Sequence, residues 1–254
     1  MNPFALDGRV AVVTWGNGGI GLGMARGLAA AGADVAVWGR NEAKNGAAVA
    51  ELEDLGAEAA AFSCDVSVED DIVEAMAASV DRFGKVDSCF VNAGIGSGAT
   101  RFAEMSLEEW RAVMRVNLDG AFLTVREAVR HMAARGAGGS IVVTSSMVAR
   151  FGMPRGEHYA STKSALLGLV RSVAVEHGRH GIRINAILPG WVESAMTEPV
   201  LGTDRFQANV KPRIPLGRWG APDDFAGIAV YLASNASRYH TADTITIDGG
   251  YSVF

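Results

Sequence analysis

Short runs of β-branched and aliphatic residues alternate along the chain with longer alanine-rich or amphipathic segments. The short runs have the length of strands buried on both faces, and the longer segments have the length of helices. Strands are predicted at 9–14, 34–38, 59–62, 86–91, 141–145, 183–188 and 244–247. Helices are predicted up to Ala31, over 42–55, 68–82 and 107–132, around Tyr159 and after Pro222. This alternation predicts an α/β protein: a doubly wound Rossmann fold with a seven-stranded parallel sheet and helices on both faces.

No linker, repeat or charge block divides the chain, so one domain over residues 1–254 is predicted. The irregular segment 189–220 mixes apolar bulk with glycine and proline and follows a predicted strand end. Ligands bind beyond the carboxyl ends of strands in open α/β sheets. We therefore interpret 189–220 as a substrate lid, with a surface loop packed by its own aromatic side chains as the alternative.

Composition excludes several classes of function. The 254 residues are 49% apolar with a net charge of −5, and no basic run indicates a nucleic-acid partner. The apolar runs are too short to span a membrane, and the N-terminal residues resemble no secretory signal. Cys64 and Cys89 lie in apolar strand-like segments, which favours reduced, buried thiols and a cytoplasmic location. The histidines form no ligand spacing with cysteine or carboxylate, so no metal is expected.

A glycine-rich turn, Gly16-x-Gly18-x-x-Gly21, follows the first predicted strand and precedes a helix. Glycines at such a turn let the backbone approach a pyrophosphate, and the helix N-terminus offers free N–H groups. In this context we favour dinucleotide binding over a purely structural turn.

The end of the second predicted strand indicates which dinucleotide is bound. It reads Trp38-Gly39-Arg40-Asn41, with no carboxylate for a ribose 2′-hydroxyl. A cation there is suited to a 2′-phosphate. NADP(H) is therefore predicted in preference to NAD(H), with a solvated Arg40 as the alternative.

Candidate acid–base chemistry lies after the strand at 141–145. Tyr159 and Lys163 are four residues apart on a predicted helix, which places them on one face. A phenol has an ordinary pKa of about 10, and a nearby ammonium is expected to lower it. Ser146 can supply a hydroxyl to the same space. The alternative is a chance pair on a solvated helix face. His158 is turned about 100° away, so we expect it to be solvated or packed.

Several separated motifs occur in a consistent order, and together they make the chain resemble the short-chain dehydrogenase/reductase family in its branch of roughly 250 residues. The motifs are the turn 14–21, Cys64-Asp65-Val66, Asn92-Ala93-Gly94, Asn117, Ser146, Tyr159-x-x-x-Lys163 and Pro189-Gly190.

The resemblance implies a role for each matching residue. Tyr159 is the expected acid/base, and Lys163 lowers its pKa and holds the nicotinamide ribose. Ser146 polarises the substrate carbonyl, and Asn117 holds a water that links the lysine to solvent. Ser194 stands where the family usually has a threonine. The implied cofactor contacts are Thr14, Gly16, Asn17, Gly19, Ile20, Gly21, Arg40, Asp65, Val66, Asn92, Ala93, Gly94, Tyr159, Lys163, Pro189, Gly190, Val192 and Ser194.

The expected reaction is hydride transfer between NADP(H) and a ketone or secondary alcohol. Apolar residues that could line the substrate pocket are Met147, Met153, Trp191, Met196 and Phe206, with Phe151 nearby. Family members are usually homotetramers or homodimers, and the aromatic C-terminal tail is a plausible subunit contact. A 3-oxoacyl-carrier reductase and a sugar or polyol dehydrogenase are alternatives on the same site.

One residue departs from the family pattern. The family motif begins Thr-Gly, whereas Thr14 is followed here by Trp15. Glycine permits backbone torsions that other residues resist. A remodelled turn with weaker cofactor binding is one consequence, and it leaves open a catalytically silent dinucleotide-binding regulator. An enoyl reductase is disfavoured, because those enzymes usually space tyrosine and lysine more widely.

Overall fold

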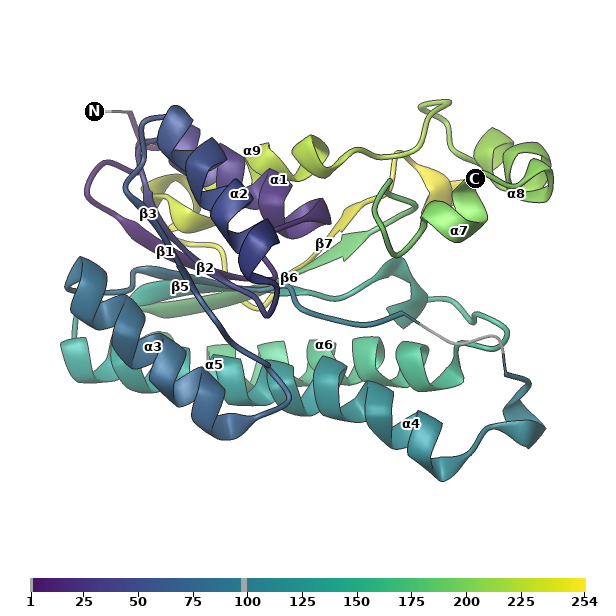
Figure 1. Ribbon diagram of the computed structural model, residues 1–254, viewed down its shortest axis with the longest axis horizontal. Coiled ribbons are helices and arrows are strands. Elements are labelled where there is room, and N and C mark those ends of the chain that lie inside the picture. Colours follow the sequence, from purple (N-terminus) through teal and green to yellow (C-terminus); the bar gives the residue numbers. More distant parts are fainter. Residues whose placement is uncertain (1, 97–99) are drawn as a thin grey trace.

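Seven parallel strands form one sheet whose order places the candidate residues at neighbouring strand ends (Figure 1). The computed structural model describes residues 2–96 and 100–254. The strands pair in the order β3-β2-β1-β4-β5-β6-β7. They are β1 (Val10–Thr14), β2 (Asp34–Trp38), β3 (Ala59–Phe62), β4 (Ser88–Val91), β5 (Gly139–Thr144), β6 (Ile182–Pro189) and β7 (Thr244–Ile247). The order reverses between β1 and β4, which is the switch point where ligands bind in such sheets.

Helices cover both faces of the sheet (Figure 1). One face carries α1 (Gly19–Ala30), α2 (Glu42–Asp54) and α9 (Ala226–Ala233). The other face carries α3 (Glu69–Phe83), α5 (Gly120–Arg135) and α6 (Glu157–His177), with α4 (Leu107–Met114) beside α6. The predicted doubly wound α/β fold is confirmed. No helix of residues 2–96 and 100–254 is long and apolar enough to cross a membrane.

Strand side chains alternate between two apolar cores because successive residues of a strand point to opposite faces. In β1, Val12 joins the core under α3, α5 and α6, whereas Ala11 and Val13 join the core under α1 and α9. Trp38 is fully buried, and its Nε1 donates a hydrogen bond of 2.9 Å to Ser79 Oγ. The hydrogen bond gives a partner to the indole nitrogen of Trp38, which is the largest fully buried side chain.

The predicted helix over 107–132 is not continuous. A π-helical turn, Arg115–Asp119, separates α4 from α5. At its centre Asn117 is buried, and its side chain bonds to both backbone groups of Ile95. Such turns are rare and often occur at functional sites. Periodicity alone did not indicate the interruption.

The segment 189–220 contains the short helices α7 (Glu198–Leu201) and α8 (Asp204–Asn209), which lie at one end of the molecule (Figure 1). It has its own apolar cluster of Leu201, Ile214 and Trp219. Trp191 and Phe206 pack against this cluster with their ring centres 4.9 Å apart. The segment therefore packs several of its own aromatic side chains.

Candidate active site

A cavity of about 310 Å³ opens at the carboxyl ends of the central strands. Ser146, Tyr159 and Lys163 line it together with the glycine-rich turn 15–20 and the segment 189–197. Residues from six separate parts of the sequence thus converge on one space. The structure brings the predicted acid–base group and the predicted dinucleotide turn into a single site.

Lys163 is held rigidly beneath this cavity. It is only 3% exposed, and its Nζ donates a hydrogen bond of 2.8 Å to the carbonyl of Thr144 at the end of β5. Nζ also lies 5.6 Å from the centre of the Tyr159 ring. Ser146 comes two residues after the end of β5, and its Oγ accepts a hydrogen bond of 3.3 Å from the Val148 N–H. Helix α6 and strand β5 therefore fix the three side chains relative to one another.

Burial is the largest influence on the pKa values of Lys163 and Tyr159. It lowers the pKa of Lys163 to about 8, because an ammonium loses hydration. It raises the pKa of Tyr159, although a hydrogen bond with Ser146 acts in the opposite direction. The expectation that Lys163 holds the Tyr159 pKa below its ordinary value is therefore not met. At neutral pH, Tyr159 is protonated and can donate a proton.

Asn117 connects the lysine region to the strand β4. Its Oδ1 accepts a hydrogen bond of 2.8 Å from the Ile95 N–H, and its Nδ2 donates one of 2.9 Å to the Ile95 carbonyl. A Cβ atom at Gly94 would lie 3.3 Å from both Asn117 Oδ1 and Lys163 Nζ. Gly94 thus leaves room for these two polar side chains to approach each other. The amide oxygen and the amide nitrogen of Asn117 therefore both hold the backbone of Ile95 in place.

The turn after β1 has the close packing that a bound pyrophosphate requires. Thr14 Oγ1 accepts hydrogen bonds from the Asn92 and Ala93 N–H groups, at 2.8 and 3.0 Å, which joins β1 to β4. Gly19 has a φ of 51°. A Cβ atom at Gly21 would lie 2.3 Å from the Trp15 carbonyl oxygen. Glycine is therefore needed at Gly21, and these residues fit a dinucleotide.

Trp15 adopts a φ of 50°, a left-handed conformation that favours glycine. Its indole lines the cavity, and the Arg40 guanidinium lies 6.0 Å from the ring centre. Arg40 also forms an ion pair of 3.0 Å with Asp65. Burial would raise the pKa of Asp65, but hydrogen bonds from Ser67 and the Arg40 cation lower it overall.

Two further polar residues flank this end of the cavity. Asn17 lines it, and its Nδ2 donates a hydrogen bond of 2.6 Å to Asn45 Oδ1. Lys44 also lines the cavity, four residues after Arg40 on α2. Lys44 was missed at the sequence level. Arg40 precedes α2, so helical spacing could not relate the two residues, and Lys44 is found only from the position of α2 beside the cavity.

The segment after β6 supplies the other wall of the cavity. Pro189, Gly190, Val192 and Ser194 all line it, as predicted for cofactor contacts. Ser194 Oγ lies 3.1 Å from the Oγ1 of Thr197, which lines the cavity too and was not predicted. Thr197 Oγ1 also bonds to the Val192 carbonyl.

Other predicted residues support the site from outside the cavity wall. Among residues 2–96 and 100–254, the ones that line the cavity do not include Thr14, Gly16, Gly21, Arg40, Asp65, Val66, Ala93 or Asn117. Val66 is buried, and its carbonyl would lie 2.6 Å from a Cβ atom at Gly120. His158 is fully buried, so it packs and is not solvated.

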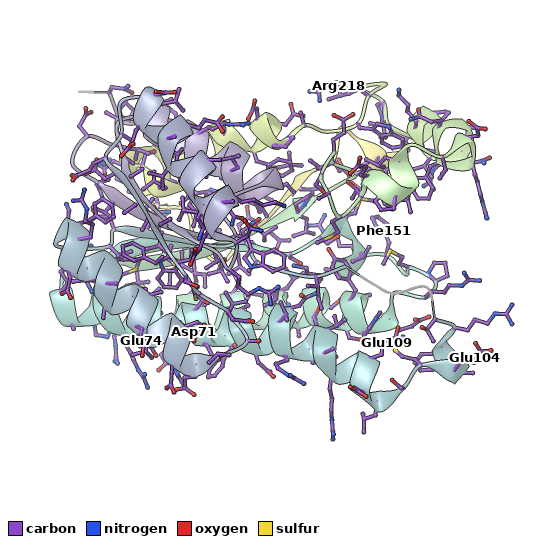
Figure 2. All side chains as sticks on the ribbon, viewed as in Figure 1. Asp71, Glu74, Glu104, Glu109, Phe151 and Arg218 are labelled. Carbon is purple, nitrogen blue, oxygen red and sulfur yellow. The ribbon has the colours of Figure 1, made fainter. Side chains whose placement is uncertain are left out.

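Of the five predicted substrate-pocket residues, the cavity wall of the described chain contains Met196 alone. A Cβ atom at Gly96 would lie 3.3 Å from Met196 Cγ, so this side chain packs against the backbone of Gly96. Met147 is buried in the turn after Ser146, and Met153 packs over Gly156. Phe151 is 44% exposed (Figure 2). Apolar character did not separate pocket residues from packing residues.

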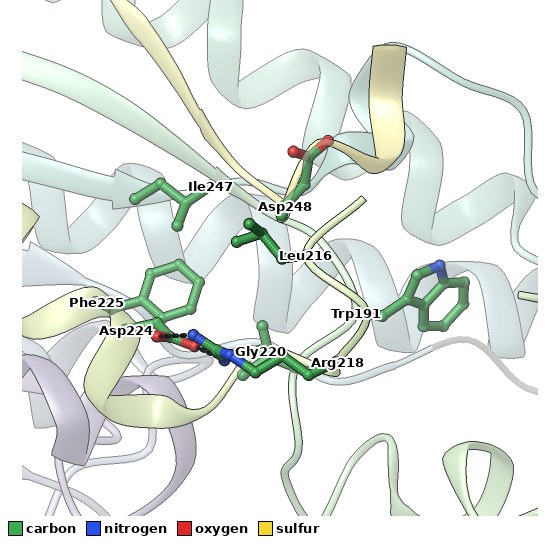
Figure 3. Close-up of a pocket in the computed structure, with 10 residues that line it drawn as sticks. Trp191, Leu216, Arg218, Gly220, Asp224, Phe225, Ile247 and Asp248 are labelled. Atoms are coloured by element: carbon green, nitrogen blue, oxygen red, sulfur yellow. Dashed lines mark hydrogen bonds and ion pairs between the residues drawn. The ribbon is translucent and has the colours of Figure 1, made fainter. Parts of the chain in front are cut away.

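Trp191 and Phe206 belong to the cluster within 189–220 and not to the site. Trp191 lies instead at a second cavity of about 180 Å³ (Figure 3). There Arg218 forms a bidentate ion pair with Asp224, at 2.6 and 2.7 Å. This cavity lacks the candidate acid–base group. Its ion pair fastens the end of 189–220 to the turn that leads into α9.

Comparisons with known proteins agree over the whole chain. Residues 16–252 match a family model described as enoyl-(acyl carrier protein) reductase. The chain is 37% identical over 251 residues to 2,5-dichloro-2,5-cyclohexadiene-1,4-diol dehydrogenase of Sphingobium indicum, covering 97% of this chain and 98% of that protein. It is 36% identical to 2-dehydro-3-deoxy-D-gluconate 5-dehydrogenase of Escherichia coli, covering 99% and 98% of the two chains.

A similar solved structure is that of a gluconate 5-dehydrogenase from Burkholderia cenocepacia in complex with NADP and tartrate. It has a TM-score of 0.94 and 35% identity, and the match covers 100% of this chain and 98% of that chain.

Proposed function

Because this chain belongs to the short-chain dehydrogenase/reductase family, we propose that it transfers hydride between a nicotinamide cofactor and a ketone or secondary alcohol. One observation carries the proposal: Ser146, Tyr159 and Lys163 line the same cavity as the glycine-rich turn. The dinucleotide would be held by the turn 15–20 and by the segment 189–197. When bound, the nicotinamide supplies or accepts the hydride.

The protein's own part is proton transfer and orientation. In the reductive direction, the Tyr159 hydroxyl donates its proton to the substrate oxygen, and the Ser146 hydroxyl donates a hydrogen bond to the same oxygen. Lys163, fixed by Thr144, stands 5.6 Å from the centre of the Tyr159 ring, so its ammonium group lies beside the tyrosinate that remains. In the oxidative direction, Tyr159 accepts the alcohol proton. The raised Tyr159 pKa suits the reductive direction at neutral pH.

We infer a preference for NADP(H) over NAD(H). Arg40 and Lys44 stand at the end of β2, where the 2′-phosphate of the adenosine ribose would lie. Arg40 is held in place by Asp65 and lies near the Trp15 indole. Lys44 lines this end of the cavity and Arg40 stands behind the Trp15 indole that lines it, and these two cations support this choice.

For the substrate, we favour an apolar ketone or its alcohol. Met196 and Ala195 line the cavity, and no arginine lines it among the described residues. A sugar-acid dehydrogenase is the second candidate, because two of the similar proteins are named for gluconate-type substrates. A substrate panel of cyclic ketones and keto-gluconates with NADPH separates the two. Faster turnover of keto-gluconates would favour the second candidate.

We also propose that residues 189–220 act as a lid. The segment contributes Val192 to Thr197 to the cavity wall and packs its remaining bulk in a separate cluster. A lid of this kind excludes water from the reacting atoms. Fluorescence of Trp191, which lies in this segment, should change on NADPH addition if the segment moves.

An apolar C-terminal surface supports a homodimer or homotetramer. Val253 is 87% exposed, Phe254 is 74% exposed and nearby Leu216 is 68% exposed. Light scattering tests this assembly. A reducing cytoplasmic location is supported by Cys64 and Cys89, whose pKa values are both raised by burial to about 12. Thiols with such pKa values are unreactive.

The decisive experiment for the reaction is Tyr159→Phe, assayed by the loss of NADPH absorbance with a panel of ketones. Turnover should fall about 10²–10⁴-fold while NADPH still binds, because that is the usual contribution of general acid catalysis. The exposed Tyr239 gives a matched control, Tyr239→Phe. Near-parental rates in Tyr159→Phe would refute Tyr159 as the acid. Binding of NADPH without turnover of any ketone by the parent would favour the silent regulator.

A further inference from the structure

Another, larger cavity lies at the amino ends of the strands, on the opposite side of the sheet from the carboxyl ends that carry the candidate active site. It measures about 520 Å³ and is lined by residues at the amino ends of the strands. Ser140 is the second residue of β5, Arg183 is the second residue of β6, and Asp87 immediately precedes β4. The six residues of β5 place the two sites about 20 Å apart at 3.3 Å a residue. The reaction proposed above makes no use of this cavity.

Three arginines line the cavity: Arg9, Arg183 and Arg238. Within residues 2–96 and 100–254, none of the three forms an ion pair with a carboxylate. Arg9 bonds to the neutral amide of Asn235 at 3.0 Å. Arg183 donates to two backbone carbonyls, those of Leu232 and His240. Their charges are therefore not neutralised locally, in a chain whose net charge is −5.

The carboxylate that lines the cavity is already neutralised. Asp87 Oδ1 accepts a hydrogen bond of 2.6 Å from Arg135, and Oδ2 forms an ion pair of 3.2 Å with Lys85. Oδ2 also accepts from the Val10 N–H at 2.9 Å. Asp87 is 6% exposed. It therefore has little capacity left to balance the three arginines.

The arginines also act on one another. Burial lowers the pKa of Arg183, and the positive charge of Arg9 lowers it further, although Tyr231 acts in the opposite direction. Placing like charges together beside a cavity costs free energy unless an anion occupies the space. The hydrogen bonds of Arg183 to two backbone carbonyls account for an arginine at that position. They do not account for Arg9 and Arg238 beside it.

We propose that this cavity, defined by Arg9, Arg183 and Arg238, binds a small phosphate-bearing polyanion. Guanidinium groups recognise phosphate oxygens through paired hydrogen bonds. A volume of about 520 Å³ falls in the range of small-molecule sites. The site is separate from the cofactor site, so both can be filled at once.

The test is calorimetric titration of pyrophosphate into the full chain saturated with NADPH, at constant ionic strength. NADPH occupies the candidate active site, so the measured heat reports pyrophosphate binding at the cavity defined by Arg9, Arg183 and Arg238. The double variant Arg9→Gln/Arg238→Gln should weaken pyrophosphate binding at least tenfold. The control is Arg111→Gln/Arg171→Gln, which removes two exposed arginines from α4 and α6. This control should bind as the parent does.

Several outcomes would overturn the proposal. These are the absence of saturable binding to the parent, an equal loss in the control, and full binding by Arg9→Gln/Arg238→Gln. Citrate that binds as tightly as pyrophosphate would overturn the phosphate assignment. If the double variant fails to fold, the exposed Arg238→Gln alone should weaken binding at least threefold. NADPH oxidation should be unchanged in every variant that folds.

Discussion

The Arg40 guanidinium lies 6.0 Å from the centre of the Trp15 indole ring. Trp15 stands where the family resemblance leads us to expect glycine, and it has a left-handed backbone with a φ of 50°. The side chain therefore occupies the adenosine end of the cavity at a conformational cost of about 1–2 kcal/mol.

Trp15→Gly should tighten NADPH binding by several-fold to tenfold, because it removes both the indole and the backbone strain. Trp15→Ala is the matched control, since it removes the indole and keeps the strain, and an intermediate dissociation constant is expected. Equilibrium titration by NADPH fluorescence measures all three proteins. A dissociation constant for Trp15→Gly equal to or above the parent's would show that the indole does not obstruct the cofactor.

Arg40→Gln should weaken NADPH binding about tenfold to hundredfold and leave NADH binding unchanged. The reason is that a hydrogen bond to a charged group contributes about 1.5–3 kcal/mol. Arg111→Gln, on the exposed surface of α4, controls for the change in net charge. The ratio of the two dissociation constants is the readout. An equal effect on NADH and NADPH would mean that Arg40 does not contact the 2′-phosphate.

The pH dependence should differ between the two directions of the reaction. Ketone reduction needs the protonated phenol of Tyr159, so kcat/KM should be constant at low pH and fall as the pH rises. The fall should begin near pH 8, where Lys163 loses its charge, because burial lowers its pKa to about 8. Alcohol oxidation needs the tyrosinate and should rise with pH instead. Parallel profiles in both directions would contradict this assignment.

The Arg218–Asp224 pair should stabilise the protein in a pH-dependent way (Figure 3). The hydrogen bonds from Arg218, together with the Ala221 N–H, lower the pKa of Asp224 to about 2. A lowered folded-state pKa gives stability that is present above the unfolded value of about 3.9 and is lost as the pH falls toward 2.

Asp224→Asn should therefore lower the Tm by about 2–4 °C or less at neutral pH, since an exposed pair contributes at most about 1 kcal/mol. Thermal melts at a series of pH values compare it with the parent, and Asp81→Asn, on the exposed surface of α3, is the control. The difference from the parent should shrink below pH 4. A difference that stays constant down to pH 2 would assign the effect to packing.

Hydrophobic patterning was sufficient to predict the architecture, because a parallel sheet buried on both faces leaves continuous apolar runs such as Val10–Thr14. Motif spacing was sufficient to place Ser146, Tyr159 and Lys163 in one cavity. Both signals are local in sequence. They describe elements and their order well.

Properties that depend on three-dimensional surroundings were not predictable. The rise in the Tyr159 pKa comes from burial, which spacing does not reveal. Met196 and Phe206 looked alike as apolar residues of one insertion, yet one lines the cavity and the other packs in a cluster. Lys44 needed the position of α2 beside the turn after β1 before its role was visible.

The π-helical turn at Arg115–Asp119 fixes the chain length between α4 and α5. A π turn accommodates one residue more than an α turn, so deleting a single residue there would restore a regular helix. All later side chains of α5 would then rotate by about 100° relative to α4. Thr124 and Ala128 would leave the interior, and Asn117 could no longer reach Ile95. The number of residues in this turn is therefore constrained by the packing of α5 and by the contact between Asn117 and Ile95.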